Sequence, residues 1–397
     1  MSPALRSLPP TAAPVSWGDF AAALRAGPEA AERFATALAG YLGVWACYPT
    51  SSGRAALALL LGVLRENLGA GRDEVIMPAY TCPALARVTL DAGLRPRLVD
   101  VIPESLGMDD AGLWRAAGDR TLAIIHVHPF GLPLEMDVAR AAATESGAAL
   151  IEDAAQALGA RLRTPEGGQR PVRAGAAATY GLLSFGPGKP LSTGGGGAIC
   201  VSDPPAAARL ERAWRELPEA SSPGTAAGLI ASRVALTPGG WSVAVRLGAQ
   251  RFGESETGMR YRRARISSFG AAIGLRALPR LDGVNARRVQ IAHALGSRLE
   301  NLDFLSLPSP AVGSGPIYLR LPVVFEDAGA RDWAYDRLTA AGLGAGRMYL
   351  RPLSEQYATL VGPFPGAEAL AVRLLTLPTH AYVTDEDVMR IAGALDA

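Results

Sequence analysis

The chain has 397 residues, of which 49% are hydrophobic and 19% charged. That is enough for one large domain or two ordinary domains with a substantial core. The formal net charge is +2 and no basic block occurs, which argues against nucleic acid as the main partner.

The cysteines and the apolar segments indicate the cellular setting. Cys47, Cys82 and Cys200 are scattered and lack metal-ligand spacing, which suits a reducing cytoplasm and argues against a disulfide framework. No uncharged apolar run reaches the roughly 20 residues of a membrane span, and the N-terminus lacks a signal-peptide layout. We expect a soluble, cytoplasmic protein with no metal site and no transmembrane segment.

The first 250 residues read as helices alternating with short apolar strands. Residues 1–15, rich in Pro, Ala and Ser, are expected to form a flexible arm. Strands rich in Val, Ile and Leu between helices favour a mostly parallel sheet covered on both faces, with ligands beyond the carboxyl ends of the strands. The predicted helices are 17–42, 55–68, 83–92, 136–146 and 210–215, and the predicted strands are 74–79, 97–102, 122–128, 148–153, 179–185 and 197–202.

The remaining chain is expected to form a smaller α+β domain. The apolar segment 218–256 suggests two helices and a turn. The pattern then predicts a helix over 267–299 with Arg287, Arg288 and Arg298 facing outward, a strand over 318–325, and helices over 332–341 and 385–395. The expected division is an arm at 1–15, a large domain at 16–255 and a small domain at 256–397.

Lys189 is the only lysine among the 39 lysine and arginine residues of the chain. Arginine stays protonated at any workable pH, whereas a buried lysine amine can lose its proton and attack a carbonyl. A protein that uses arginine for all its other cations would therefore still need a lysine to form a Schiff base. The alternative is an inert surface lysine left in an arginine-rich composition.

Three other features support a chemical role for Lys189. Ser52-Gly53-Arg54 opens an apolar helix, and such a helix start suits a phosphate, although an ordinary serine N-cap has the same pattern. Asp153 and Ser184 each lie at the end of a predicted strand. A phosphate seat, a carboxylate for a pyridine nitrogen and an amine for an aldehyde together suit pyridoxal phosphate.

These residues occur in strings that resemble the DegT/DnrJ/EryC1/StrS family of sugar aminotransferases. The resemblance is close over residues 40–205 and looser over 258–397. It implies an α/β large domain of the aspartate-aminotransferase type (fold type I), a smaller C-terminal α+β domain, and pyridoxal phosphate bound at the interface of a homodimer. The strings are Ser52-Gly53-Arg54-Ala55-Ala56-Leu57, Asp73–Ala79, Gly93–Asp100, Val127–Gly131, Ile151–Gly159 and Ser184-Phe185 followed by Lys189 and Gly196-Gly197.

The resemblance also implies roles for single residues. Lys189 would bind the cofactor covalently and move a proton, Asp153 would pair with the pyridine nitrogen, and Gln156 would bond the phenolic oxygen. Arg260 stands where the family usually has an asparagine that reaches the neighbouring subunit's phosphate, and a guanidinium can make that contact through two N–H groups. The phosphate site would comprise Ser52, Gly53, Arg54 and Ser184.

The sequence departs from the family pattern mainly near the expected substrate. Cys82 stands where an aromatic residue commonly stacks on the cofactor, so Tyr80 or another contact would replace it. Gly195 replaces a frequent glutamate, and Arg54 replaces a threonine. The substrate-side candidates are His128, Tyr349 and Arg351, although His128 is equally well explained as a structural histidine.

The expected reaction is the transfer of an amino group from glutamate or glutamine to a keto group, with a nucleotide-linked keto sugar as acceptor. A non-sugar ketone, a sugar dehydration and a non-catalytic regulator that binds pyridoxal phosphate remain alternatives. Some relatives that deoxygenate sugars replace the lysine with histidine, so Lys189 favours transamination. A regulator of this kind usually adds a DNA-binding domain, and no segment of the sequence suggests one.

Overall fold

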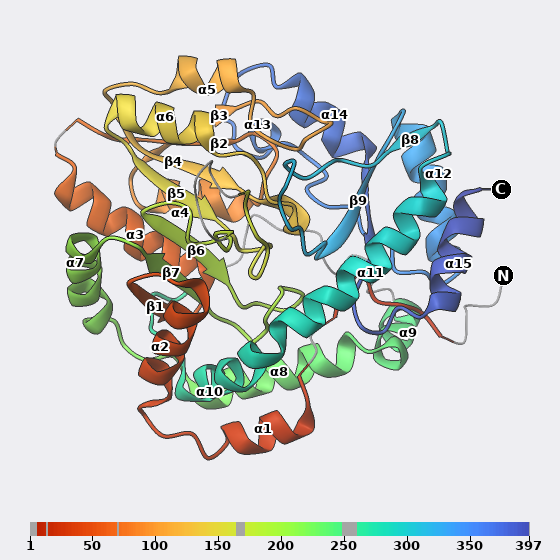
Figure 1. The fold of residues 1–397 in the computed structure, drawn as a ribbon, viewed down its shortest axis with the longest axis horizontal. Helices are drawn as coiled ribbons and strands as arrows, with labels where there is room; N and C mark the ends of the chain where they lie inside the picture. The colour runs from red at the N-terminus through yellow and green to blue at the C-terminus, as the bar shows by residue number, and fades with distance from the viewer. Residues whose placement is uncertain (1–5, 13–14, 70, 164–170, 248–259, 397) are drawn as a thin grey trace.

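The structure is a computed structural model that describes residues 6–12, 15–69, 71–163, 171–247 and 260–396. The large domain is built on a seven-stranded sheet, and the small domain lies at the carboxyl side of that sheet (Figure 1). Among the described residues, no helix is both long enough and apolar enough to cross a membrane.

The large sheet has the strand order β1-β7-β6-β5-β4-β2-β3. All neighbouring pairs are parallel except those of β7, which runs antiparallel to both β1 and β6. This confirms the expected α/β class with a mostly parallel sheet. The first strand was not predicted. The strands are β1 (Ala46–Thr50), β2 (Glu74–Pro78), β3 (Arg95–Val99), β4 (Thr121–Val127), β5 (Ala149–Asp153), β6 (Tyr180–Ser184) and β7 (Gly197–Val201).

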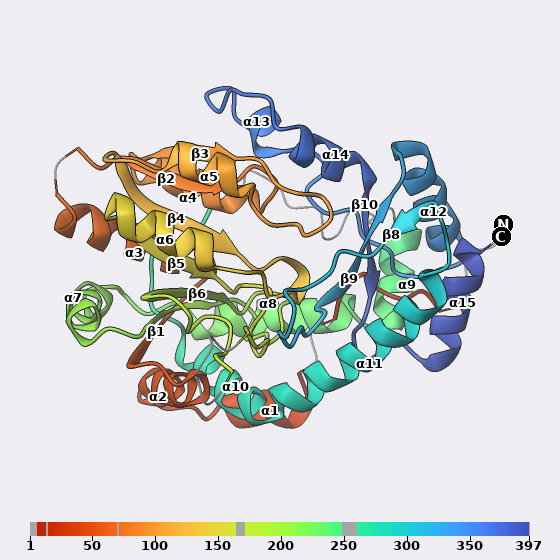
Figure 2. The same cartoon turned by 45° about the horizontal axis from the view of Figure 1, so that its top comes forward.

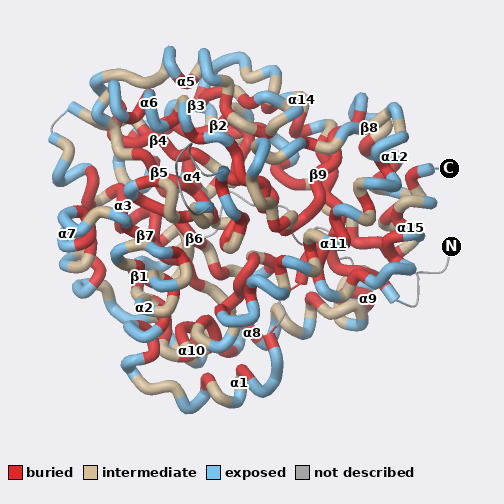
Figure 3. The backbone as a smooth tube through the Cα atoms, viewed as in Figure 1, coloured by how far each residue is buried: buried red, intermediate tan, exposed pale blue. Residues whose placement is uncertain are grey.

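Helices cover both faces of this sheet because alternate strand residues point to opposite sides. On β4, for example, Ile124 and Ile125 belong to different buried clusters. Figure 3 shows the buried backbone concentrated in the strands and the helix faces that pack on them. One face carries α3 (Gly53–Asn67), α4 (Pro83–Asp91) and α7 (Pro204–Arg215), and the other carries α2 (Ala30–Leu42), α5 (Asp110–Ala116), α6 (Asp137–Ser146) and α10 (Ser268–Ala277).

The small domain is α+β, as expected. Its antiparallel sheet has the order β10-β9-β8, and α11 runs from the large domain to this sheet (Figure 2). The sequence patterns missed β10 and α14. The elements are α11 (Leu281–Leu299), β8 (Leu305–Ser306), β9 (Arg320–Phe325), α12 (Ala328–Ala340), α13 (Leu353–Gln356), α14 (Pro365–Arg373), β10 (Leu374–Pro378) and α15 (Asp385–Leu395).

Some expected helices differ from those observed. The helix expected over 17–42 is two helices, α1 (Trp17–Ala23) and α2, separated by a turn that contains Pro28. The helix expected over 267–299 is α10 and α11, separated by a 3-10 turn that contains Pro279, because proline cannot donate a helical hydrogen bond. The two helices expected within 218–256 are α8 (Ser222–Ala235) and α9 (Pro238–Arg246).

The expected exposure of Arg288 was wrong, and the packing of α10 bears on the expected domain boundary. Arg288 does not face outward, because it is 2% exposed and donates through Nη1 to Asn285 Oδ1 at 2.6 Å. α10 follows the domain boundary expected at 256, yet it packs against α1 and α2 of the large domain. The core of the small domain therefore begins with α11.

The described part of the N-terminal arm is packed, contrary to the expectation of a flexible segment. Residues 7–12 are buried. Leu8 N donates to Gly342 O at 2.7 Å, and His380 Nε2 donates to Pro9 O at 2.8 Å. Thr11 Oγ1 donates to Gly188 O at 3.4 Å. This strap, residues 6–12, therefore connects the small domain to the residue next to Lys189. Residues 1–5 and 13–14 lie outside the described residues.

Candidate active site

The carboxyl ends of the parallel strands bring several predicted residues together. Asp153 ends β5 and Ser184 ends β6, and these two strands are parallel neighbours. Because parallel strands end at the same edge of a sheet, both side chains lie where open α/β sheets bind ligands. The paired residues Ser184 and Gly197 place the start of β7 at the same edge.

The start of α3 lies against this edge. A Cβ atom on Gly53 would lie 3.2 Å from Ser184 Cβ, and one on Gly197 would lie 2.4 Å from Gly53 N. Ser52 Oγ accepts from Ala55 N at 3.1 Å, so Ser52 is the N-cap of the helix. The N–H groups of the first helical turn have no partner within the helix, which makes this glycine-lined contact suitable for a phosphate.

Lys189 lies in a turn after β6, beside Gly188 in the left-handed region at φ +76°. Burial lowers the pKa of its amine; the charges of Cys82 and Asp153 raise it and that of Arg320 lowers it further. Burial raises the pKa of the Asp153 carboxyl, whereas Ala155 N–H, Lys189 and His128 lower it. The lone lysine and the strand-end aspartate therefore share one electrostatic environment, and burial lowers the pKa of the amine in it.

Gln156 and Tyr349 join the large domain to the small domain at this site. Gln156 Nε2 donates to Tyr349 Oη at 2.9 Å, and Phe130 N donates to Gln156 Oε1 at 3.1 Å. Tyr349 has a φ of 50°, an uncommon value for a residue other than glycine. Burial raises the pKa of its hydroxyl well above the usual value. Tyr349 therefore reaches the predicted site as a neutral phenol.

His128 does not offer a free nitrogen to a substrate. It is fully buried, with Nε2 3.1 Å from Glu152 Oε1 and Nδ1 accepting from Leu134 N at 3.1 Å. Since Nδ1 accepts, Nε2 carries the proton and donates to Glu152. Glu152 also accepts from Gly175 N and Ala177 N. These contacts favour a structural role for His128, and Glu152 is an unpredicted residue that fixes these loops.

The other predicted residues fall in different surroundings. Cys82 is the N-cap residue of α4 and affects the pKa of Lys189, so it lies near the site. Tyr80, the proposed replacement for a stacking residue, packs edge-on to Tyr349 and donates to Met348 O. Arg260 and Arg351 are exposed. Nothing among the described residues connects those two arginines to Lys189.

The residues present fit pyridoxal phosphate. The cradle of Gly53, Gly197 and Ser184 leaves no room for further side-chain atoms and adjoins the unpaired N–H groups of α3. An amine and a carboxyl of perturbed pKa lie at the same sheet edge. Among the described residues, no cluster of His, Cys, Asp and Glu has the arrangement of a metal site.

Arg320 is a residue of this site that the sequence analysis missed. Its charge affects the pKa of both Lys189 and Tyr349, although it lies in the small domain. The available signal was a charged residue in the otherwise apolar strand pattern Ile317-Tyr318-Leu319-Arg320-Leu321. Charged residues are rarely buried without a partner, so an arginine within an apolar strand pattern indicates a candidate site residue.

Comparison with known proteins agrees with this geometry. The family model described as the DegT/DnrJ/EryC1/StrS aminotransferase family matches residues 20–396. The chain is 32% identical over 379 residues to the erythromycin biosynthesis sensory transduction protein EryC1 of Saccharopolyspora erythraea, covering 94% of this chain and 90% of the relative. It is 32% identical over 361 residues to the UDP-N-acetyl-3-dehydro-alpha-D-glucosamine 3-aminotransferase of Acidithiobacillus ferrooxidans, covering 90% and 85%.

A solved structure gives the same result at the level of the fold. DesV of S. venezuelae, solved in complex with a ketimine intermediate, superposes with a TM-score of 0.74 at 26% identity, covering 95% of this chain and 93% of DesV. The family match extends over nearly the whole length, and the strand-end residues Asp153 and Ser184 meet the start of α3 at one edge of the sheet. The chain belongs to the DegT/DnrJ/EryC1/StrS aminotransferase family.

Proposed function

We propose that this protein uses pyridoxal phosphate to transfer an amino group from glutamate or glutamine to a nucleotide-linked keto sugar. The observation that carries the proposal is the position of Lys189, the one lysine of the chain, in the same electrostatic environment as Asp153. The nucleotide-sugar acceptor is supported by the relative from Acidithiobacillus ferrooxidans, whose name specifies a UDP-linked keto sugar.

Each described residue has a place in this reaction. Ser184 and the first turn of α3 would hold the phosphate, and the Asp153 carboxylate would hold the protonated pyridine nitrogen. When bound, pyridoxal phosphate supplies an electron-accepting ring that stabilises negative charge on the carbon of the donor. Because burial lowers its pKa, the Lys189 amine can take the proton from that carbon and return it.

The cofactor site would be completed by a second copy of the chain. Arg260 is exposed and has no role within its own subunit among the described residues, which is consistent with a contact to the phosphate of a neighbouring subunit. We propose a homodimer on this basis. Light scattering that gives a monomer mass for the active, cofactor-loaded protein would argue against this part of the proposal.

The test of the function is a two-step assay on wild type and two variants. Glutamate or glutamine should bleach the visible absorbance of the lysine-bound cofactor in the wild type, and a nucleotide keto sugar should restore it. Lys189→Ala should lack that absorbance and lose turnover by at least about 10³-fold. Lys189→Arg keeps the positive charge and should fail as completely, because a guanidinium cannot form the covalent bond. Near-normal turnover in either variant would falsify the assignment.

A non-catalytic regulator is the second candidate, because one relative is named a sensory transduction protein. The same assay separates the two functions. A regulator would bind the cofactor. It would not convert the bound cofactor from its aldehyde form to its amine form when glutamate or glutamine is added. A response to the donor without any response to keto sugars would instead point to a non-sugar ketone.

A further inference from the structure

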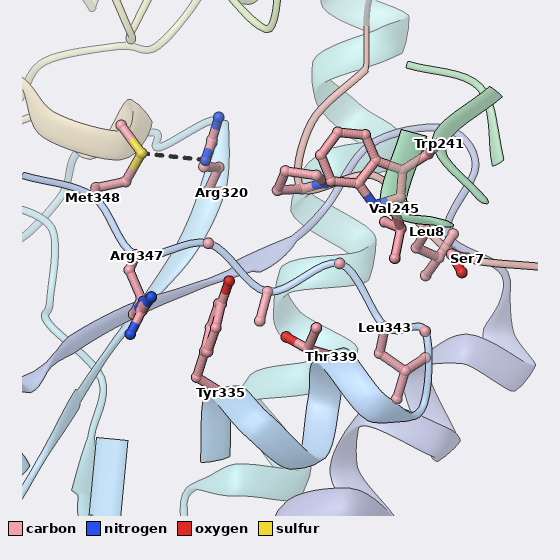
Figure 4. A pocket seen from close by; sticks show the side chains of 15 residues that line it. Ser7, Leu8, Trp241, Val245, Arg320, Tyr335, Thr339, Leu343, Arg347 and Met348 are labelled. Atoms are coloured by element: carbon pink, nitrogen blue, oxygen red, sulfur yellow. Dashed lines mark hydrogen bonds between the residues drawn. The ribbon is translucent and has the colours of Figure 1, made fainter. Parts of the chain in front are cut away.

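Arg320, the first residue of β9, is a buried cation without an acidic partner in the described part of the chain. It is 7% exposed, and within that part its guanidinium makes one hydrogen bond, from Nη1 to Met348 Sδ at 3.3 Å (Figure 4). Burial lowers its pKa to about 10, so the group stays protonated at neutral pH. A buried charge is costly unless it is paired, so this position calls for an anion.

The neighbouring arginines of the small domain are partnered. Arg331, 6% exposed, has Nε 2.7 Å from Asp332 Oδ1. Arg347 lies over the ring of Tyr335 at 4.1 Å, with Nη1 3.6 Å from Asp332 Oδ1. In Figure 4 the Arg347 side chain points toward Tyr335 and away from Arg320. Arg331 and Arg347 thus have acidic or aromatic partners, whereas the two buried arginines Arg288 and Arg320 have none among the described residues. Of these two, Arg288 bonds the side-chain amide of Asn285, and Arg320 alone lines a cavity.

Arg320 lines a cavity of about 40 Å³. A single water needs roughly 10–15 Å³ by this measure, so the cavity has room for a group the size of a carboxylate and not for a nucleoside diphosphate. The planar guanidinium matches the two oxygens of a carboxylate. Pro10 of the strap, Gly346 and Met348 also line this cavity, and no acidic side chain does so among the described residues.

Two residues that line the cavity, Met348 and Arg320, relate it to the cofactor site. Met348 precedes Tyr349, whose hydroxyl accepts from Gln156 at the cofactor site, and the charge of Arg320 reaches Lys189. An amino-acid donor carries its carboxylate on the carbon that bears the reacting amine. Its carboxylate must therefore bind close to Lys189. Arg260 and Arg351 are exposed and do not offer an enclosed cation for this purpose.

We propose that Arg320 binds the carboxylate on the reacting carbon of the amino donor. The anion site follows from the burial of Arg320 and its cavity, whereas the identification of the anion as the amino donor rests on the proposed function. Met348 Sδ accepts a hydrogen bond from Nη1 of Arg320, and the other guanidinium nitrogens would bind the ligand.

Binding of glutarate, an unreactive dicarboxylate, to the cofactor-loaded protein tests the anion site by titration calorimetry. Arg320→Met should weaken binding by roughly 10- to 100-fold, the range of a charge-assisted hydrogen bond, and Arg320→Lys should recover part of it. Arg331→Met is the matched control, because it removes a buried arginine of the same domain that already has a partner. The site is overturned if wild type binds no glutarate, or if Arg320→Met and Arg331→Met bind it equally well.

The half-reaction with two donors tests the identity of the anion. Glutamine carries the carboxylate on the reacting carbon, and 4-aminobutanamide is the same molecule without it. In Arg320→Gln the rate constant for glutamine should fall roughly 10- to 100-fold, whereas that for 4-aminobutanamide should change less than about 2-fold. Equal losses for both donors would overturn the proposal. Arg320-dependent glutarate binding without any half-reaction would uphold the anion site and reject the aminotransferase function.

Discussion

Asp153 lies where the proposed reaction needs a carboxylate, but burial makes ionisation of its side chain unfavourable. Its Oδ1 accepts from Ala155 N at 2.9 Å, which fixes the orientation of the carboxyl, yet burial raises its pKa above the usual value of 3.8. The folded protein without cofactor therefore bears a cost for ionising this group. Such conflicts between the stability of the fold and the function of a residue are characteristic of active sites.

Asp153→Asn should separate these two effects. An acid with a raised pKa in the folded state costs no stability below pH about 4, and its cost grows as the pH rises to neutrality. The cofactor-free variant should therefore match wild type near pH 4 and be more stable than wild type at pH 7, because asparagine can still accept from Ala155. Turnover of the loaded variant should fall about 10²–10³-fold. Urea titrations at both pH values measure the stability, and a less stable variant at pH 7 would contradict the prediction.

At the scale of secondary structure, the site depends on the contact between α3 and the ends of β6 and β7. Gly197 permits this contact, because a Cβ atom there would lie 2.4 Å from Gly53 N and 2.7 Å from Leu183 O. Both neighbours are backbone atoms and cannot move independently of their elements. The helix start and the strand ends are therefore held at a spacing that only glycine allows.

Gly197→Ala should displace the first turn of α3 from Ser184. We expect at least about a 10-fold weaker affinity for pyridoxal phosphate and a loss of about 1–3 kcal/mol in unfolding free energy, the usual cost of overpacking. Gly40→Ala is the matched control, because a Cβ atom at this helical position meets nothing within 4 Å. It should leave cofactor affinity unchanged and stabilise the fold by up to about 1 kcal/mol. Fluorescence titration with the cofactor measures the first effect, and urea unfolding the second.

At the scale of the whole molecule, the buried side chain of His380 joins the strap, residues 6–12, to the small domain. His380 donates to Pro9 O while its Nδ1 accepts from Tyr382 N at 3.3 Å. Burial lowers the pKa of His380 to about 4, although the hydrogen bond to Pro9 opposes this shift. Burial also lowers the pKa of His126 to about 3. Both imidazoles are therefore neutral in the folded protein at pH 7.

Stability should consequently fall as the solution is acidified. A histidine with a lowered pKa leaves stability intact above its unfolded value of 6.5, and stability is lost as the pH falls toward 4 because the unfolded chain binds the proton first. His380 alone should account for about 2–3 kcal/mol of this loss. His380→Gln, which can still donate to Pro9, should flatten the pH dependence by that amount. His293→Gln, at an exposed position, should leave it unchanged. Guanidinium unfolding between pH 4 and 7 measures both slopes.

The sequence by itself determined the α/β class, most strands of the large sheet, and the identity of Lys189, Asp153 and Ser184 as the central candidates. These features depend on periodicity and on motifs of neighbouring residues, which can be read along the chain. Only the tertiary structure decided that Tyr349 bonds Gln156, that the ring nitrogens of His128 are already occupied, and that Arg320 reaches the site from another domain. Those contacts join segments far apart in the sequence, and packing of whole elements, which local patterns do not encode, brings them together.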